Sequence, residues 1–170
     1  MEVIIRTETS DDYKVVFDLN VKAFGQENES RLIEALRKSN AFVPELSLVA
    51  EVDGKVVGHI LFTKVTIGDS KHEGLALAPV AVAPDAQRQG LGTRLVEAGL
   101  KKAAELGFDS VVVLGHENYY PKFGFKSASN WNITTGYNSP ESTFALELKN
   151  GALEHVSGLV EYPKEFLVVS

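Results

Sequence analysis

The feature that most constrains the fold is a strand, a helix and a second strand that follow one another between residues 75 and 114. The run LALAPVAVAP is apolar and β-rich, and TRLVEAGLKKAAELG carries apolar residues on one helix face and ends at Gly107. The run DSVVVL has the unbroken apolar character of a strand buried on both faces. A strand, a crossover helix and a second strand predict a right-handed unit whose strands are parallel.

The residues before this unit predict antiparallel strands and two helices. Asp53-Gly54 separates LSLVAEV from KVVGHILFTKVTI, and this dipeptide favours the type I′ turn of a hairpin. Helices are predicted over residues 11–24 and 29–38, and further strands over residues 3–5 and in STFALELK. Pro79 lies inside its apolar run, so that strand lacks a partner on one side there or bulges. The sequence therefore predicts a mixed α/β sheet, and a single domain over residues 1–170 because no linker or repeat divides the chain.

Composition narrows the classes of function. The net charge of -6 argues against a general affinity for nucleic-acid phosphates or anionic lipid. The chain has no cysteine, which excludes a thiolate metal site and an acyl-cysteine intermediate, and its four histidines show no paired spacing, so we expect no metal. The start MEVIIRTETSDDY lacks the features of a signal peptide, and no apolar run reaches the roughly 18 residues of a membrane span. A cytoplasmic location is expected.

The segment QRQGLGT, residues 87–93, precedes the crossover helix, where unpaired backbone N–H groups suit a phosphate. A dinucleotide fingerprint needs a third glycine where Leu95 stands and an acidic residue closing the next strand, whereas Asp109 opens it. A P-loop needs Gly-Lys-Ser/Thr, which is missing after both Gly90 and Gly92. On the glycines alone, a bare strand-to-helix turn stays open as an interpretation.

Two motifs together carry a family resemblance. Gln87-x-x-Gly90-x-Gly92 resembles the acetyl-CoA signature of the GNAT superfamily of N-acetyltransferases, and Tyr120-Pro121-Lys122-Phe123-Gly124-Phe125 resembles that family's Tyr-x-x-x-Gly-Phe. The resemblance extends over residues 3–148. The segments LALAPVAV and YYxxFGF are similar to those of the YhbS-like bacterial branch of the family. It implies the GNAT fold, with a mixed central sheet of about six or seven strands, antiparallel in its N-terminal part, parallel splayed strands 4 and 5, and about four flanking helices.

The resemblance also implies acetyl-CoA as co-substrate and a set of residues that would hold it. The backbone N–H groups of residues 89–93 would surround the pyrophosphate, Arg88 would add positive charge, and residues 80–82 would pair with the pantetheine arm, which Asn118 would also contact. The cofactor-binding residues expected in this way are Val80, Ala81, Val82, Gln87, Arg88, Gln89, Gly90, Leu91, Gly92, Thr93 and Asn118. Tyr120 would be the catalytic acid that protonates the departing thiolate, and its structural alternative is a tyrosine that only packs the short helix.

The expected activity is direct transfer of an acetyl group to a primary amine of a small molecule or a protein, by a monomer or a homodimer. A non-catalytic acyl-CoA-binding sensor or partner module is the alternative. No general base stands out: His72, Glu73, His116 and Glu117 are candidates, and His59 is expected to be structural. The acceptor pocket is expected within residues 24–46 and 127–145, where the candidate lining residues are Phe24, Phe42, Trp131 and Tyr137.

Overall fold

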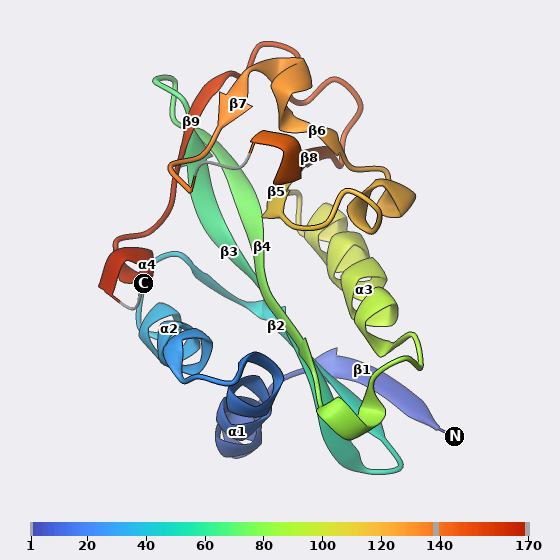
Figure 1. Ribbon diagram of the computed structural model, residues 1–170. Helices are drawn as coiled ribbons and strands as arrows, with labels where there is room; N and C mark the ends of the chain where they lie inside the picture. The colour runs from blue at the N-terminus through green and yellow to red at the C-terminus, as the bar shows by residue number, and fades with distance from the viewer. Residues whose placement is uncertain (1, 138–139, 169–170) are drawn as a thin grey trace. The chain divides into compact units, whose positions relative to one another are not determined.

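The computed structural model describes residues 2–137 and 140–168 as a mixed sheet with helices (Figure 1). The strand order is β1-β2-β3-β4-β5-β8-β6, and β9 pairs with β3 and β7. The strands are β1 (Val3–Thr7), β2 (Phe42–Val52), β3 (Lys55–Ile67), β4 (His72–Val82), β5 (Ser110–Leu114), β6 (Lys126–Ser127), β7 (Ile133–Thr134), β8 (Thr143–Glu147) and β9 (Gly158–Glu161). The α-helices are α1 (Tyr13–Phe24), α2 (Asn28–Arg37), α3 (Leu91–Glu105) and α4 (Glu165–Val168).

Short 3-10 helices lie between these elements: η1 (Ser10–Asp12), η2 (Pro84–Ala86), η3 (Tyr120–Phe123), η4 (Ala128–Trp131) and η5 (Pro140–Ser142). The described chain divides into two compact units. The first unit holds residues 1–63, 78–102 and 164–170, and the second holds residues 64–77 and 103–163. The prediction of a single domain is not tested by this division.

In the first unit, strands β1, β2 and β3 pair antiparallel, as the sequence predicts. Asp53 and Gly54 have φ values of 51° and 83°, which are the left-handed conformations that a type I′ hairpin turn requires. Helix α1 ends at Gly25, whose φ of 71° allows the left-handed stop. Helices α1 and α2 lie side by side (Figure 1).

Helix α3 packs on one face of this antiparallel part through glycines. A Cβ atom at Gly99 would lie 2.1 Å from Cε1 of Phe62, and one at Gly58 would lie 3.0 Å from Cδ1 of Leu95. Because side chains alternate along a strand, His59 and Leu61 face the side opposite to Gly58 and Phe62. The sheet in this unit therefore has an apolar face against α3 and a second face that carries polar groups.

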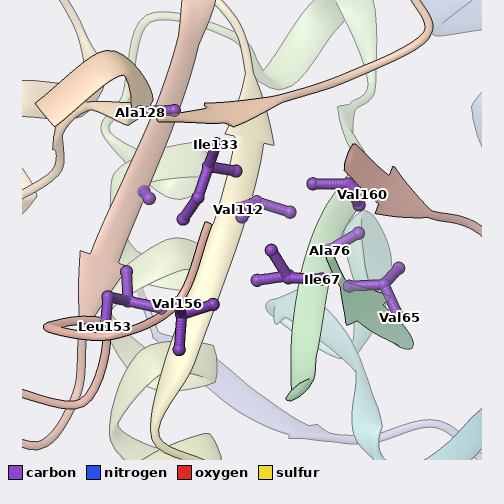
Figure 2. Packing of buried hydrophobic residues seen from close by; sticks show 10 residues of the cluster. Val65, Ile67, Ala76, Val112, Ala128, Ile133, Leu153, Val156 and Val160 are labelled. Carbon is purple, nitrogen blue, oxygen red and sulfur yellow. The ribbon is translucent and has the colours of Figure 1, made fainter. Parts of the chain in front are cut away.

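In the second unit, β4 and β5 are parallel, with Leu75 opposite Val111 and Ala76 opposite Val112, which confirms the predicted crossover. Strand β8 pairs antiparallel with β5. A buried apolar cluster fills the space over these strands (Figure 2), with Val65, Ile67, Ala76, Val112, Ala128, Ile133, Ala145, Leu153, Val156 and Val160 as members.

Two features differ from the sequence prediction. Within the described residues the sheet has nine strands rather than six or seven, because β6 and β7 are two residues long and too short to show an alternating pattern. Strand β7 also pairs parallel with β9. Pro79 lies inside β4 after a cis peptide bond, and the interruption of pairing expected there, like the splaying of β4 and β5, stays a prediction.

Candidate active site

In the first unit, the segment from β4 to α3 is an open turn with two left-handed residues. Arg88 has a φ of 67° and Gly90 a φ of 77°, and nothing lies within 4 Å of the position where Gly90 would carry a Cβ atom. The Nε2 atom of Gln87 donates to the carbonyl of Val82 at 3.1 Å, and the N–H of Ala83 donates to the carbonyl of Val57 at 2.8 Å. These bonds fix the start of the turn and leave its glycine facing open space.

Helix α3 begins directly after this turn. The N–H of Arg94 donates to the carbonyl of Gly90 at 3.1 Å, so the N–H groups of Leu91 and Gly92 lie outside the helix's own hydrogen-bond pattern. Leu91 is 1% exposed and packs in a cluster with Val57 and Ala86. The leucine side chain thus anchors a helix N-terminus whose dipole favours an anion.

The other residues predicted to bind a cofactor have different exposures. Val80 and Val82 are half-buried in β4 and Ala81 is buried, while Thr93 is half-buried in the first turn of α3. The exposed residues of this set are Gln87, Arg88, Gln89 and Gly90 in the first unit and Asn118 in the second. The turn at residues 87–90 is therefore open to solvent.

In the second unit, Tyr120 is the first residue of η3, and its side chain packs against other aromatic rings. It is 7% exposed, and its ring makes edge contacts with Tyr119 at 5.0 Å and with Phe125 at 5.7 Å between ring centroids. Burial, with a smaller contribution from Tyr119, raises the pKa of Tyr120 to about 12. Tyr120 therefore keeps its proton at neutral pH and can serve as a donor.

Gly115 was not singled out by the sequence, although it lies against the Tyr120 ring. A Cβ atom at this position would be 2.1 Å from Cε2 of Tyr120, so only glycine leaves room for the ring. The N–H of Gly115 donates to the carbonyl of Ser142 at 2.9 Å, which fixes the glycine at the end of β5. A glycine directly after the apolar run VVVL is the sequence signal that could have identified it.

The histidines proposed as general bases lie at opposite ends of β5. The Nε2 atom of His72 lies 3.0 Å from Oδ1 of Asp109, just before β5 begins. The carbonyl of His116 accepts the N–H of Tyr119 at 3.1 Å, just after β5 ends, and both His116 and Glu117 are exposed. Because β4 and β5 are parallel, His72, the first residue of β4, lies at the end of β5 away from Tyr120. The structure thus separates His72 from Tyr120 and leaves His116 near it in the chain.

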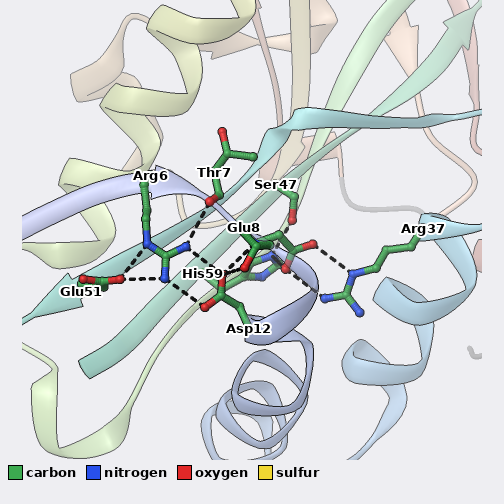
Figure 3. A network of polar contacts seen from close by, with 9 residues as sticks. Arg6, Thr7, Glu8, Asp12, Arg37, Ser47, Glu51 and His59 are labelled. Atoms are coloured by element: carbon green, nitrogen blue, oxygen red, sulfur yellow. Dashed lines mark hydrogen bonds and ion pairs between the residues drawn. The ribbon is translucent and has the colours of Figure 1, made fainter. Parts of the chain in front are cut away.

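A buried polar network in the first unit involves no residue predicted to bind the cofactor (Figure 3). The guanidinium of Arg37 binds the Glu8 carboxylate with two hydrogen bonds of 3.0 Å. His59 is fully buried, and its Nε2 atom lies 3.0 Å from Oγ of Ser47 and 3.8 Å from Oε2 of Glu8. Burial and the neighbouring Arg37 lower the pKa of His59 to about 3, so the histidine is neutral at pH 7 and forms no ion pair with Glu8. This placement confirms the structural role expected of His59.

A second part of this network fixes the entry to α1. Arg6 donates to both carboxylate oxygens of Asp12, at 2.7 Å and 2.9 Å, and also contacts Glu51 at 2.7 Å. The hydrogen bond from Arg6, reinforced by the backbone N–H of Thr9, lowers the pKa of Asp12 to about 2. The network ties β1, β2 and the start of α1 together through charge-assisted hydrogen bonds.

The acceptor region expected at residues 127–145 holds an open pocket of about 240 Å³, but hydroxyl groups rather than aromatic rings line it. Trp131 packs against the apolar cluster, and Tyr137 makes an edge contact with Tyr162 at 5.2 Å. In the first unit, Phe24 is exposed and Phe42 is half-buried opposite Thr63. The pocket's lining residues are Ser129, Asn132, Ile133, Thr134, Thr135, Pro140 and Thr143. Trp131 and Tyr137 are not among these residues, so their place in an acceptor pocket stays a prediction.

Two absences hold for the described residues. Within residues 2–137 and 140–168, no three His, Asp or Glu side chains are grouped so that they could hold a metal ion. No helix in the same ranges has both the length and the apolar character needed to cross a membrane.

Comparisons with known proteins agree with the geometry. Residues 13–125 match the model of the acetyltransferase (GNAT) family. The chain is 33% identical over 166 residues to the uncharacterized N-acetyltransferase YhbS of Escherichia coli strain K12, covering 96% of this chain and 98% of that protein.

Two solved structures resemble the whole chain. The crystal structure of YhbS from Escherichia coli in complex with CoA gives a TM-score of 0.91 at 30% identity, covering 98% of this chain and 93% of that one. The crystal structure of a GNAT family acetyltransferase from Brucella melitensis in complex with acetyl-CoA gives a TM-score of 0.79 at 31% identity, covering 97% of this chain and 98% of that one.

Proposed function

Because the chain belongs to the acetyltransferase (GNAT) family, we propose that it transfers the acetyl group of acetyl-CoA directly to a primary amine of a small molecule or a protein. The observation that carries the proposal is the exposed turn at Arg88 and Gly90, which leads into the N-terminus of α3. The two similar structures with CoA and acetyl-CoA support the choice of co-substrate. The absence of cysteine favours direct transfer over an acyl-enzyme on sulfur.

The first unit would hold the pyrophosphate. The open space at Gly90 admits a phosphate close to the backbone, where a side chain would obstruct it. The N–H groups of Leu91 and Gly92 and the dipole of α3 supply donors and positive potential, and Arg88 adds a formal charge. The residues present therefore fit an anionic group, and we extend the assignment to residues 80–82 and to Thr93 and Asn118 as predicted from the motif.

The second unit would supply the proton. Acetyl-CoA brings the acetyl group as a thioester, and aminolysis leaves a thiolate that needs a proton. Tyr120 keeps its proton at neutral pH, as an ordinary tyrosine does, and burial raises its pKa further. Donation from a group with a pKa of about 12 requires a strongly basic acceptor, and the thiolate would be more basic if it too were buried away from water.

Partners and location belong to the same proposal. The net charge of -6 supports an amine acceptor rather than nucleic acid or a membrane surface. We propose a cytoplasmic protein that acts as a monomer or a homodimer.

Ligand-dependent unfolding tests the cofactor, with acetyl-CoA, NAD and ATP as the three ligands. We expect stabilisation by acetyl-CoA alone, of about 2.7 kcal/mol at a concentration of 100 times the dissociation constant. No stabilisation by acetyl-CoA would contradict the proposal. Release of free CoA with a panel of amines then tests transfer, and binding without release for any amine would favour the non-catalytic module.

A further inference from the structure

We propose that the hydroxyl-lined pocket of the second unit binds an uncharged, hydroxyl-bearing part of the acceptor amine. This inference rests on the proposed function, since it names the chemical class of the acceptor. The pocket has a volume of about 240 Å³, and its seven lining residues come from η4, β7, η5, the start of β8 and the residues beside them. Ligand sites usually start at roughly 300 Å³, so this pocket suits one small group such as a sugar ring or a short polyol.

The lining combines neutral polar groups with apolar surface, which makes up the larger share of the wall. Of the seven lining residues, five carry a hydroxyl or an amide, and none carries a charge. A charged group placed here would lose water without gaining a counter-charge, whereas a ligand hydroxyl can both donate to and accept from the lining hydroxyls. Ile133 and Pro140 add an apolar surface that suits the C–H face of a ring. The five polar lining residues are Ser129, Asn132, Thr134, Thr135 and Thr143.

Several polar groups are held in place before any ligand arrives. Asn132 has a φ of 55°, its N–H donates to the carbonyl of Ser129 at 3.1 Å, and its carbonyl accepts the N–H of Gly158 at 3.0 Å. The Thr135 hydroxyl donates to the Tyr162 hydroxyl at 3.4 Å. The Oγ atom of Ser129 lies 2.8 Å from that of Ser127. The main chain of Asn132 and the hydroxyls of Ser129 and Thr135 are thus held by the protein and lose little freedom when a ligand binds.

The pocket also lies at the end of β5 that leads to Tyr120. Thr143, which lines the pocket, is the register partner of Leu114, the last residue of β5. The carbonyl of the preceding residue, Ser142, accepts the N–H of Gly115, and Gly115 packs against the Tyr120 ring. An acceptor held by its hydroxyl groups in this pocket is therefore bound beside the strand end that positions the proposed acid.

Binding of two matched amines tests the assignment, with glucosamine as the hydroxylated probe and cyclohexylamine as the probe without hydroxyls. We expect glucosamine to shift the backbone amide NMR signals of Ser129, Asn132 and Thr134 and to bind roughly 10-fold tighter than cyclohexylamine, since several neutral hydrogen bonds add. Thr134→Val should weaken glucosamine binding about 5-fold and leave cyclohexylamine unchanged. Thr66→Val is the matched control, because Thr66 is a half-buried strand threonine of the same unit outside the pocket.

Equal affinity for the two amines, no detectable binding of glucosamine at millimolar concentration, or shifts confined to other residues would each overturn the inference. Stabilisation by acetyl-CoA is measured on the same samples and separates the two proposals. If acetyl-CoA stabilises the protein but glucosamine is not preferred, only the pocket assignment fails. If glucosamine binds in the pocket but acetyl-CoA does not stabilise the protein, the proposed function fails, and the pocket's role as an acceptor site fails with it although the pocket binds hydroxyl groups.

Discussion

The turn before α3 and the segment around Tyr120 both follow a strand and both need a glycine, but for opposite reasons. At Gly90 the space around the α-carbon is empty, and the residue is required for its φ of 77°. At Gly115 the space is filled by the Tyr120 ring, and the residue is required because a Cβ atom would collide with it. The first region is therefore shaped by backbone conformation and the second by side-chain packing.

This difference separates binding from stability. The turn is exposed from Gln87 to Gly90 and is anchored by Leu91, so a change at its tip should affect ligand binding more than folding. The Tyr120 ring is buried among Tyr119 and Phe125, so a change in its surroundings should affect folding and chemistry together. Four experiments test this contrast.

The largest effect is expected for Tyr120→Phe, which keeps the ring and removes only the hydroxyl. Turnover with an accepted amine should fall on the order of 100-fold, as for the loss of a general acid, while acetyl-CoA affinity and the melting temperature stay close to the parent values. Steady-state CoA release and thermal unfolding measure the two effects. Tyr119→Phe is the control, and an equal fall in that variant would show that Tyr120 is not special.

Gly115→Ala should disturb packing as well as chemistry. The added methyl meets the Tyr120 ring, which we expect to lower the free energy of unfolding by roughly 2 kcal/mol and to reduce turnover. Urea denaturation and CoA release report the two quantities. Gly136→Ala is the matched control, since nothing lies within 4 Å of its added methyl. Normal stability in Gly115→Ala would mean that the Tyr120 ring can move away from the added methyl. Gly115 would then not be required for packing, contrary to the difference proposed between it and Gly90.

Gly90→Val should do the reverse and weaken binding more than folding. A side chain in the left-handed region costs about 1 kcal/mol of stability, whereas acetyl-CoA affinity should fall about 10-fold or more, because the methyl groups enter the space left for the pyrophosphate. Gly25→Val is the control, since Gly25 has a φ of 71° and equally open surroundings in the same unit. Unimpaired acetyl-CoA binding in Gly90→Val would place the pyrophosphate elsewhere.

The smallest effect is expected for the pH dependence of stability, because burial keeps the His59 side chain neutral. Burial raises the pKa of Tyr120 and lowers that of His59, so the two groups respond at opposite ends of the pH range. His59 takes up a proton in the unfolded chain below pH 6.5 but not in the folded protein until about pH 3, so stability falls as the pH falls through this window.

For His59 alone, the free energy of unfolding should be about 1 kcal/mol lower near pH 5.8 than above pH 7.5. Urea midpoints against pH measure the slope, and His59→Gln should remove it. If the slope persists in that variant, the acid sensitivity belongs to other groups.

Local signals in the chain allowed much of the fold to be predicted. Asp53-Gly54 identified the hairpin and Gly107 the end of α3, because these residues specify backbone angles that few others adopt. The apolar period of α3 and the unbroken apolar run of β5 identified the parallel crossover. Strands β6 and β7 could not be found in this way, since two residues carry no period and their pairing depends on β8 and β9.

The candidate site was predictable only in part. The exposed turn at residues 87–90 follows from its motif, and its left-handed residues agree with an anion-binding role that remains a proposal. The packing contacts of Trp131 and Tyr137 could not be predicted from the sequence. Whether an aromatic ring packs or lines a pocket depends on neighbours that are distant in sequence.

The sequence by itself determined where the chain turns, which segments are helices or long strands, and which family the motifs resemble, because these depend on residues within a few positions of one another. Only the tertiary structure decided that Gly115 makes room for Tyr120, that Leu91 anchors the turn, and that hydroxyl groups gather into a pocket. Each of these is a contact between side chains or strands that the chain brings together only when it folds, and its energy depends on distances of a few tenths of an ångström.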